Sequence, residues 1–340
     1  MSFFDKGRPF VIAEMSGNHN HSLERAIKIV EAAAEAGVDA VKLQTYTADT
    51  MTIDCREGEF FIDDPKNLWY GQSLYELYQK AYTPWEWHEP IFKRCKELGI
   101  IGFSTPFDAT AVDFLEKLDV PAYKIASFEN IDTPLIKKVA ATRKPMLVSN
   151  GIATVADLDK CVRAGREGGC SDIALLKCTS VYPADVKDSN LLTIPHMKQL
   201  FDCPVGISDH TIGIGASIAA VALGACIIER HFTLSREDGG VDAAFSLEPA
   251  EMKQLVIEAR NAFSALGRVQ YGPTPQESAG ARRSLYVVKD MKKGEKFSAD
   301  NMRSIRPGKG LRPEFYDVLL GKKVNRDVTK GMPIGWDLID

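Results

Sequence analysis

"VGISDHTIG" (residues 205–213) and "ACIIERHFT" (residues 225–233) follow one pattern, in which a short apolar run ends in charged residues and a histidine. Short, nearly continuous apolar runs are typical of parallel strands that are covered on both faces. Residues 214–225, between the two runs, form a helical pattern. This part of the chain therefore predicts a strand, a helix and a second strand, with polar side chains at both strand ends.

The same alternation extends from the start of the chain to about Gly267. Helical patterns separate the apolar runs, and the first helix has Ser22 as its expected N-cap and Gly37 as its stop. Eight strand–helix units of this total length match a (β/α)8 TIM barrel. The alternative is an open doubly wound sheet, but no glycine-rich dinucleotide fingerprint follows the first strand. The predicted strands are residues 9–14, 40–45, 101–105, 122–127, 145–150, 173–179, 205–209 and 226–232.

The chain is predicted to have a barrel domain at residues 1–268, a linker at 269–284 and a small domain at 285–340. The linker is rich in glycine, proline and polar residues. A domain as small as the last one is marginally stable alone, so it is expected to dock on another surface. Residues 46–83 form an aromatic and acidic insertion after the second strand. The insertion is interpreted as a lid over a site, a packing elaboration or a dimer contact.

The composition argues against several classes of protein. The 340 residues carry a net charge of -4, so no basic excess indicates binding to nucleic acid or to an anionic membrane. No apolar run approaches the roughly 18 to 20 residues that span a bilayer, and the N-terminus lacks the pattern of a signal peptide. The seven cysteines include no C-x-x-C pair. This usage predicts a cytoplasmic location and argues against a zinc–cysteine site.

All eight predicted strands end in polar residues. In a TIM barrel the chemistry lies at these strand ends, so this rim predicts an active site. A purely structural barrel would leave many buried polar groups without partners, which is costly. Lys42 and Lys124 lie inside apolar strands, and with the nearby hydroxyl groups they indicate a pocket for phosphate or carboxylate.

His210 and His231 follow adjacent strands, so their rings are expected to converge. Two imidazoles with open positions beside them suit a divalent metal of the Mn, Fe, Co or Zn type. The same pair also suits acid–base work. A single histidine at a strand end is more often a hydrogen-bonded structural residue, so the prediction depends on the convergence of two.

The motifs at these strand ends resemble those of the sialic acid synthase family, in order and in spacing. The tail at residues 285–311 resembles the antifreeze-like (SAF) domain of that family, so the resemblance covers essentially the whole chain. It implies a TIM barrel followed by a small SAF domain. The motifs are "IAEMSGNHN" (12–20), "VKLQT" (41–45), "STPFD" (104–108), "AYKIASFE" (122–129), "LVSNG" (147–151), "CTSVYP" (178–183), "GISDHT" (206–211) and "ERHFT" (229–233).

The resemblance also implies a reaction. Members of the family condense phosphoenolpyruvate with an N-acylated sugar in its aldehyde form and release phosphate by C–O cleavage. Stretches such as 73–90 and 242–249 look like the pseudaminic acid synthase branch. That branch implies 2,4-diacetamido-2,4,6-trideoxy-L-altrose as acceptor and a role in surface-glycan or flagellin-glycan synthesis. The alternative is an N-acetylneuraminate or legionaminic acid synthase that uses an N-acetylmannosamine-type acceptor.

Catalytic roles are carried over from the family by position. His210 and His231 match its metal ligands, which usually hold Mn2+, with Mg2+ or Co2+ as alternatives. Glu129 matches an acid near the metal-bound water, and Glu14 matches an acid that holds the sugar. The residues expected to bind the two substrates are Lys42, Gln44, Thr105, Lys124, Ser127, Thr179, Ser180, Tyr182, Ser208, Asp242 and Arg306.

Arg306 and Ser180 have specific expectations within this set. Arg306 matches an arginine that the SAF domain sends into the partner's site, because the family works as a domain-swapped homodimer. Ser180 stands where the family often has an asparagine that contacts phosphate.

Two other functions remain open from the residues alone. A Schiff-base aldolase would use Lys42 or Lys124 as a nucleophile with a lowered pKa, but it leaves the histidine pair without a role. A sugar- or ice-binding protein would use the C-terminal segment on an inert barrel, but it leaves the polar strand ends without a role.

Overall fold

The computed structural model describes residues 2–277 and 279–340, and the chain divides after Gly267 into two compact units. Each unit has its own hydrophobic core. Within the described residues, no helix combines the length and the apolar character needed to cross a membrane.

Eight parallel strands of the N-terminal unit form a closed barrel, in which each strand pairs with the next and β8 pairs with β1. This closure confirms the predicted TIM barrel and rules out the open sheet. The fourth strand is shorter than predicted, because the chain turns after Ile125. The strands are β1 (Phe10–Glu14), β2 (Ala40–Thr45), β3 (Ile101–Pro106), β4 (Tyr123–Ile125), β5 (Met146–Ser149), β6 (Ile173–Cys178), β7 (Val205–Ser208) and β8 (Ile227–His231).

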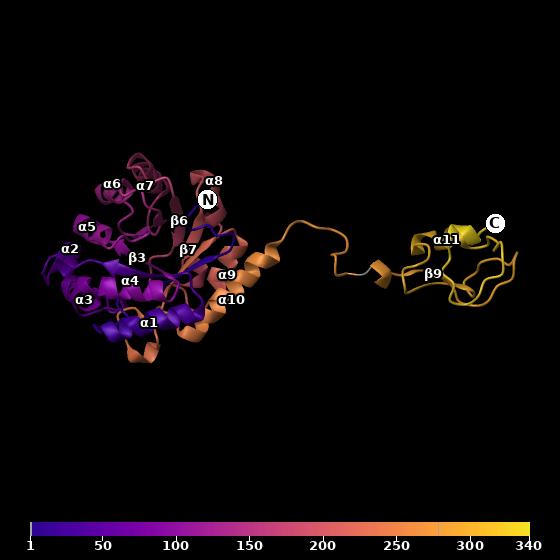
Figure 1. Ribbon diagram of the computed structural model, residues 1–340, viewed down its shortest axis with the longest axis horizontal. Helices are drawn as coiled ribbons and strands as arrows, with labels where there is room; N and C mark the ends of the chain where they lie inside the picture. The colour runs from indigo at the N-terminus through magenta and orange to yellow at the C-terminus, as the bar shows by residue number, and fades with distance from the viewer. Residues whose placement is uncertain (1, 278) are drawn as a thin grey trace. The chain divides into compact units, whose positions relative to one another are not determined.

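Helices surround these strands (Figure 1). The first helix begins and ends as predicted: the Ser22 hydroxyl accepts a hydrogen bond from the backbone N–H of Arg25, and Gly37 adopts a left-handed φ of 86°. The outer helices are α1 (Leu23–Ala36), α4 (His88–Glu97), α5 (Ala109–Lys117), α6 (Thr133–Ala141), α7 (Val155–Glu167), α8 (Thr193–Phe201), α9 (Gly215–Ala222) and α10 (Pro249–Leu266).

Apolar side chains fill the inside of the barrel. Phe10, Phe103 and Leu147 are fully buried there, and Phe4 joins them from the N-terminal segment. Burying a side chain of this size stabilises the fold by about 1.5–3 kcal/mol. One position on β7 has no room for a side chain, because a Cβ atom on Gly206 would lie 2.4 Å from the carbonyl oxygen of Ile227.

The strand register brings the polar strand ends to one level. Glu14 lies opposite Lys42 on β2 and opposite His231 on β8. Ser208 on β7 lies opposite Glu229 on β8. Charged and hydroxyl side chains of neighbouring strands therefore meet at the carboxyl end of the barrel.

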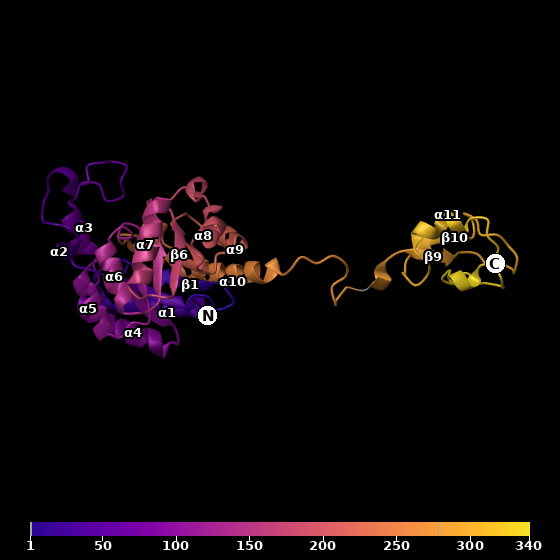
Figure 2. The same ribbon diagram turned by 90° about the horizontal axis from the view of Figure 1, so that it is seen from above.

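The insertion after β2 contains two short helices, α2 (Ala48–Met51) and α3 (Leu74–Ala81), which lie side by side (Figures 1 and 2). In the segment that connects α2 to α3, the indole N–H of Trp69 donates a hydrogen bond of 3.0 Å to the carbonyl oxygen of Val241. Val241 lies in the segment that follows β8, so the insertion is fastened to a distant part of the rim.

The C-terminal unit is built on a two-stranded antiparallel sheet of β9 (Ser284–Val287) and β10 (Met302–Ile305). A short helix, α11 (Tyr316–Leu319), packs on it through Leu319, which belongs to the same core as Leu285. Each of these two leucines is fully buried.

Candidate active site

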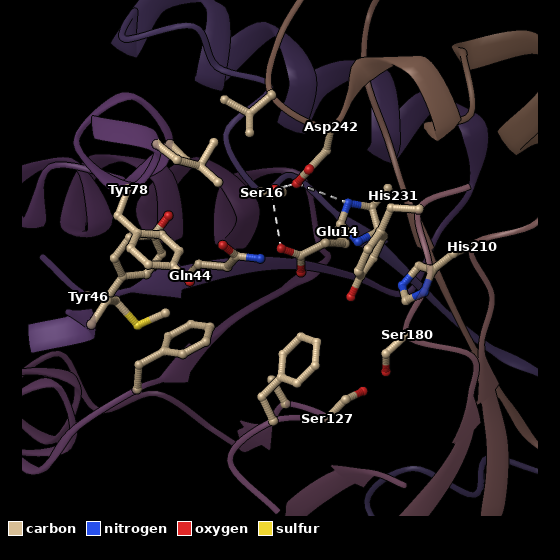
Figure 3. Close-up of a pocket in the computed structure, with 18 of the residues that line it drawn as sticks. Glu14, Ser16, Gln44, Tyr46, Tyr78, Ser127, Ser180, His210, His231 and Asp242 are labelled. Atoms are coloured by element: carbon tan, nitrogen blue, oxygen red, sulfur yellow. Dashed lines mark hydrogen bonds and ion pairs between the residues drawn. The ribbon is translucent and has the colours of Figure 1, made fainter. Parts of the chain in front are cut away.

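A cavity of about 770 Å³ lies at the carboxyl ends of the barrel strands. Figure 3 shows part of its lining, with Ser180 and His210 on one side and Tyr46 and Tyr78 on the other. Twelve of the predicted site residues line this cavity: Glu14, Lys42, Gln44, Lys124, Ser127, Glu129, Ser180, Tyr182, Ser208, His210, His231 and Asp242.

Four buried charged residues form the floor of the cavity. Lys42 pairs with Glu14, and Lys124 pairs with Glu229 at 2.9 Å. Glu229 also lies 3.8 Å from the ammonium group of Lys42, so it links the two lysines. The hydroxyl group of Ser208 donates to Glu229 at 2.8 Å. The two positive and two negative charges balance, and all four side chains are at most 4 % exposed.

Burial and charge act against each other in this cluster. The two ammonium groups hold the pKa of the Glu229 carboxyl below its usual range. Burial raises the pKa of Glu14, although Lys42 opposes this shift. Burial lowers the pKa of Lys124, although Glu229 opposes that shift. The carboxylates therefore hold two ammonium groups at the floor, where an anionic ligand can bind them.

The two predicted histidine ligands converge, with ring centroids 5.2 Å apart. His210 donates from Nδ1 to the carbonyl oxygen of Thr179 at 3.0 Å, which leaves Nε2 free to bind a metal. His231 Nδ1 is buried and has no hydrogen-bond partner among the described residues. It lies 3.6 Å from Asp242 Oδ2.

These donor atoms fit a divalent metal held by two imidazoles. The residues that the structure describes contain no group of three or more His, Cys, Asp or Glu side chains arranged for a metal. The ring of Tyr182 packs beside the pair, tilted by 42° to the ring of His210, with the two centroids 4.5 Å apart.

Hydroxyl groups line the side of the cavity next to the lysines. Ser127, Ser149 and Ser180 all face it, and the Ser149 hydroxyl is buried without a hydrogen-bond partner in the described chain. Gly151 lies directly behind them, since an added Cβ would lie 2.3 Å from the Cβ atom of Ser127 and 2.8 Å from the Ser180 hydroxyl. Such a group of hydroxyls suits the oxygen atoms of a phosphate.

Glu129 is the carboxyl group best suited to proton transfer near neutral pH. Burial raises its pKa to about 7. Its Oε2 atom is buried and has no hydrogen-bond partner in the described part of the chain. A carboxyl group with this pKa can exchange a proton efficiently at physiological pH.

Ser16 links two acids, Glu14 on the floor beside Lys42 and Asp242 beside His231. Its hydroxyl donates to Asp242, and its backbone N–H donates to Glu14 at 3.1 Å (Figure 3). Ser16 adopts a left-handed φ of 50°, which is uncommon for a serine. The turn after β1 therefore fixes both carboxylates relative to His231.

Three predicted residues lie outside the cavity lining. Thr105 accepts a hydrogen bond of 3.0 Å from the ammonium group of Lys42, so it positions this lysine without lining the cavity itself. Thr179 contributes its carbonyl oxygen to His210, while its hydroxyl donates to the carbonyl oxygen of Asp188. Arg306 lies exposed at the end of β10, in the C-terminal unit.

Glu229 was not predicted as a site residue, although the sequence contains a signal for it. Side chains alternate between the two faces of a strand, so Glu229 and His231 face the same side and Arg230 faces the other. Arg230 pairs with Asp209 at 2.6 Å, away from the lysines. Ser16 and the lining residues of the insertion were not predicted either. The insertion lines the cavity through Tyr46, Thr50, Met51, Ile62, Lys66, Asn67, Leu68, Trp69, Leu74, Leu77, Tyr78 and Ala81.

Comparison with known proteins gives consistent matches over nearly the whole chain. The NeuB family model matches residues 29–271, and the SAF domain model matches residues 282–340. Pseudaminic acid synthase of Campylobacter jejuni is 45% identical over 95% of this chain and 94% of its own length. Pseudaminic acid synthase of Helicobacter pylori is 41% identical over 98% of each chain.

Two solved structures agree with these matches. The crystal structure of the spore coat polysaccharide biosynthesis protein SpsE from Bacillus subtilis is 35% identical, with a TM-score of 0.65, over 98% of this chain and 95% of its own. The crystal structure of the N-acetylneuraminic acid synthetase of Leptospira borgpetersenii has a TM-score of 0.71 at 29% identity. It covers 79% of this chain and 89% of its own.

Proposed function

Because the chain belongs to the NeuB family, we propose that it is a pseudaminic acid synthase. It condenses phosphoenolpyruvate, 2,4-diacetamido-2,4,6-trideoxy-L-altrose and water to pseudaminic acid and phosphate. The observation that carries the proposal is the buried pair Lys42 and Lys124 beside two convergent histidines, in a cavity large enough for both substrates. The alternative is a legionaminic or N-acetylneuraminate synthase, but the relatives named N,N'-diacetyllegionaminic acid synthase are less similar, at 34% and 36% identity.

The donor binds at the lysine floor. Phosphoenolpyruvate carries a phosphate and a carboxylate, so Lys42 and Lys124 neutralise it inside a chain that is acidic overall. Ser127 and Ser180 donate hydrogen bonds to its oxygen atoms, and Ser208 supports this side of the cavity by donating to Glu229, the partner of Lys124. Thr105 acts through Lys42 as a positioning residue.

The acceptor binds beside the donor, where Glu14 and Asp242 face the cavity. Glu14 and Asp242 accept hydrogen bonds from its hydroxyl and amide groups, and Ser16 fixes both acids in place. Gln44 and Tyr182 line the space between the acids and the donor. Thr179 contributes through its carbonyl group, which orients His210.

His210 and His231 would hold a divalent metal, Mn2+ first and Mg2+ or Co2+ next. Such a metal, when bound, supplies a Lewis acid that polarises the acceptor aldehyde. The hydrogen bond from His210 to Thr179 fixes the tautomer of His210. His231 is buried, so its ring is shielded from solvent.

The reaction forms a C–C bond and converts the aldehyde oxygen into a hydroxyl group by protonation. At the second carbon of phosphoenolpyruvate it forms a C–O bond to water and breaks the C–O bond to phosphate. The third carbon of phosphoenolpyruvate attacks the aldehyde, and its second carbon becomes an oxocarbenium centre. Water adds to that centre while Glu129, with a pKa of about 7, accepts a proton. The tetrahedral intermediate then loses phosphate together with the former enol oxygen, which leaves the 2-keto acid.

We also propose that the enzyme is a domain-swapped homodimer in which Arg306 enters the partner's site. Large apolar side chains are exposed in the loops after β4 to β7, at Phe128, Ile131, Ile152 and Leu192 among others, so this rim is suited to being covered. Charge supports the same docking. The C-terminal unit has 15 Lys and Arg against 9 Asp and Glu, whereas the N-terminal unit has 27 against 37.

The proposed location is the cytoplasm, and the proposed use of the product is surface-glycan or flagellin-glycan synthesis. All seven cysteines are free, which is typical of a reducing compartment.

The test is phosphate release from phosphoenolpyruvate, measured with and without a chelator across three acceptors. These are the altrose-type diacetamido sugar, its manno-configured analogue and N-acetylmannosamine. Chelator-sensitive release that is fastest with the first acceptor is expected. Faster release with another acceptor would reassign the substrate, and no release from folded, metal-supplemented protein would refute the synthase function.

A further inference from the structure

A buried ion pair lies directly behind the two histidines of the cavity. Asp209 precedes His210 at the end of β7, and Arg230 precedes His231 on β8. The histidines line the cavity, whereas Asp209 and Arg230 do not, because successive side chains of a strand face opposite sides. Arg230 pairs with Asp209 at 2.6 Å, and each side chain is 1 % exposed. This ion pair therefore joins the two strand ends that carry the histidines.

The guanidinium group of Arg230 holds the turn around His210 on both sides. One of its nitrogen atoms pairs with Asp209, and the other donates a hydrogen bond of 2.7 Å to the carbonyl oxygen of Thr211. A planar guanidinium can make two such contacts in a fixed geometry, which an ammonium group cannot. His210 lies between the two contacted residues in the chain. Its backbone is therefore fastened to the strand position directly before His231.

Asp209 closes the same turn from the other end of the ion pair. Its carboxylate accepts hydrogen bonds from the backbone N–H of Thr211 at 2.9 Å and from the hydroxyl of Ser217 at 2.5 Å. Ser217 belongs to α9, so the turn is also fastened to a helix outside the barrel. The carbonyl oxygen of His210 accepts a further hydrogen bond of 3.0 Å from the backbone N–H of Ala184. These contacts fix the backbone of His210 relative to β8.

Stability alone is a poor reason for charges at these two positions. The preceding residues on the same faces of the two strands, Ile207 and Ile228, belong to the apolar core between the strands and the helices. Removing two charges from water is costly, and apolar residues of similar size are often as stable in such a place. A guanidinium with two partners fixes a geometry, which apolar packing does less well. The pair is therefore better suited to positioning than to stabilising.

We infer that Arg230 and Asp209 are positioning residues that set the separation of the His210 and His231 rings for a divalent metal. This inference rests on the proposed function, which assigns the metal to these histidines. The ring centroids are 5.2 Å apart, and Figure 3 shows the two rings as neighbours in the cavity. A metal bound by both rings senses any change in their separation. Residues that orient metal ligands typically contribute about 10–100-fold to metal affinity.

Mn2+ binding to the full-length protein without substrates tests this role, with free Mn2+ measured by its EPR signal. The double variant Asp209→Asn/Arg230→Met removes both charges, so it leaves no buried charge without a partner. Its asparagine keeps an oxygen atom that can accept the hydrogen bond from Thr211. The variant is expected to fold, as urea unfolding will show, and to bind Mn2+ about 10–100-fold more weakly than the wild type. Arg230→Lys keeps the charge but loses the second contact, so its affinity should lie between the two.

Arg8→Met/Asp39→Asn is the matched control. Arg8 pairs with Asp39 at 3.0 Å just before β1 and β2 begin, at the end of the barrel opposite the histidines. Loss of this pair should leave the Mn2+ affinity within about twofold of the wild type. An equal loss of affinity in the control would overturn the inference, because the effect would then reflect general destabilisation.

Two further results would overturn the inference. One is an Mn2+ affinity of the folded Asp209→Asn/Arg230→Met variant equal to that of the wild type. If that variant does not fold, the affinity of Arg230→Lys decides, and an unchanged value would overturn the inference. The other is a wild type that binds no Mn2+, which would also remove the metal from the two histidines. Phosphate release by the wild type, measured separately, shows whether the proposed synthase function survives either result.

Discussion

Replacing Glu229 by Gln is expected to destabilise the N-terminal unit by about 3–5 kcal/mol. The carboxylate of Glu229 accepts hydrogen bonds from Lys124 at 2.9 and 3.2 Å and from Ser208 at 2.8 Å. It also lies 3.8 Å from Lys42. Glutamine removes the charge and turns an N–H donor toward an ammonium group. Two buried lysines then share a single carboxylate, that of Glu14, and one positive charge is left without a counter-charge.

Urea unfolding followed by circular dichroism measures this loss at pH 7. The midpoint should fall with little change in slope, since the surface exposed on unfolding stays the same. Glu237→Gln is the matched control, because Glu237 is exposed and forms no ion pair within the described chain. Equal stability of wild type and Glu229→Gln would refute the reasoning that this carboxylate stabilises two buried lysines.

The pH dependence gives a second check on the same residue. The lysines hold the pKa of Glu229 below its ordinary value of 4.5, so the carboxylate binds fewer protons in the folded chain than in the unfolded chain. Its contribution to stability is therefore fully present above pH 4.5 and is lost as the pH falls through the lowered pKa. The difference between wild type and Glu229→Gln should shrink progressively as the pH falls below 4.5.

Three further predictions concern catalysis and binding. Glu129→Gln should keep the fold and lower kcat by about 10²–10⁴-fold. The kcat of the wild type should fall below about pH 7, and this fall should be absent from the variant. Near-normal turnover of the variant would show that Glu129 is not the base. Gly151→Ala should raise the KM for phosphoenolpyruvate, because the added methyl group displaces Ser127. An unchanged KM in initial-rate assays would contradict the role of Ser127 in binding phosphoenolpyruvate. Trp69→Phe keeps an aromatic ring but loses the hydrogen bond to Val241, so the acceptor KM should rise by about two- to tenfold. The same KM in both proteins would show that this hydrogen bond does not position the lid.

The barrel could be predicted from the sequence because its signals are local. Apolar runs, the N-cap Ser22 and the stop at Gly37 each follow from a few neighbouring residues. The convergence of His210 and His231 was predictable for a related reason, since adjacent parallel strands end at the same edge. Lys42 and Lys124 stood out because a charge inside an apolar strand needs a partner or a ligand.

The remaining features depend on contacts between distant segments. Glu229 is followed by an arginine and a histidine. Only the alternation of side chains along the strand shows that Glu229 faces the cavity and that Arg230 faces the other side. The position of the insertion depends on the hydrogen bond from Trp69 to Val241, which spans 172 residues. No local pattern predicts such a contact, so the sequence left open whether the insertion was a lid.

We propose that the protein joins phosphoenolpyruvate to the altrose-type sugar by C–O cleavage. The experiment that tests this directly uses phosphoenolpyruvate labelled with ¹⁸O at the oxygen that bridges carbon and phosphorus. Mass spectrometry then measures the ¹⁸O content of both products. We predict labelled phosphate and an equal amount of an unlabelled nine-carbon diacetamido 2-keto acid. Unlabelled phosphate with ¹⁸O in the keto acid, or no nine-carbon product at all, would contradict the account.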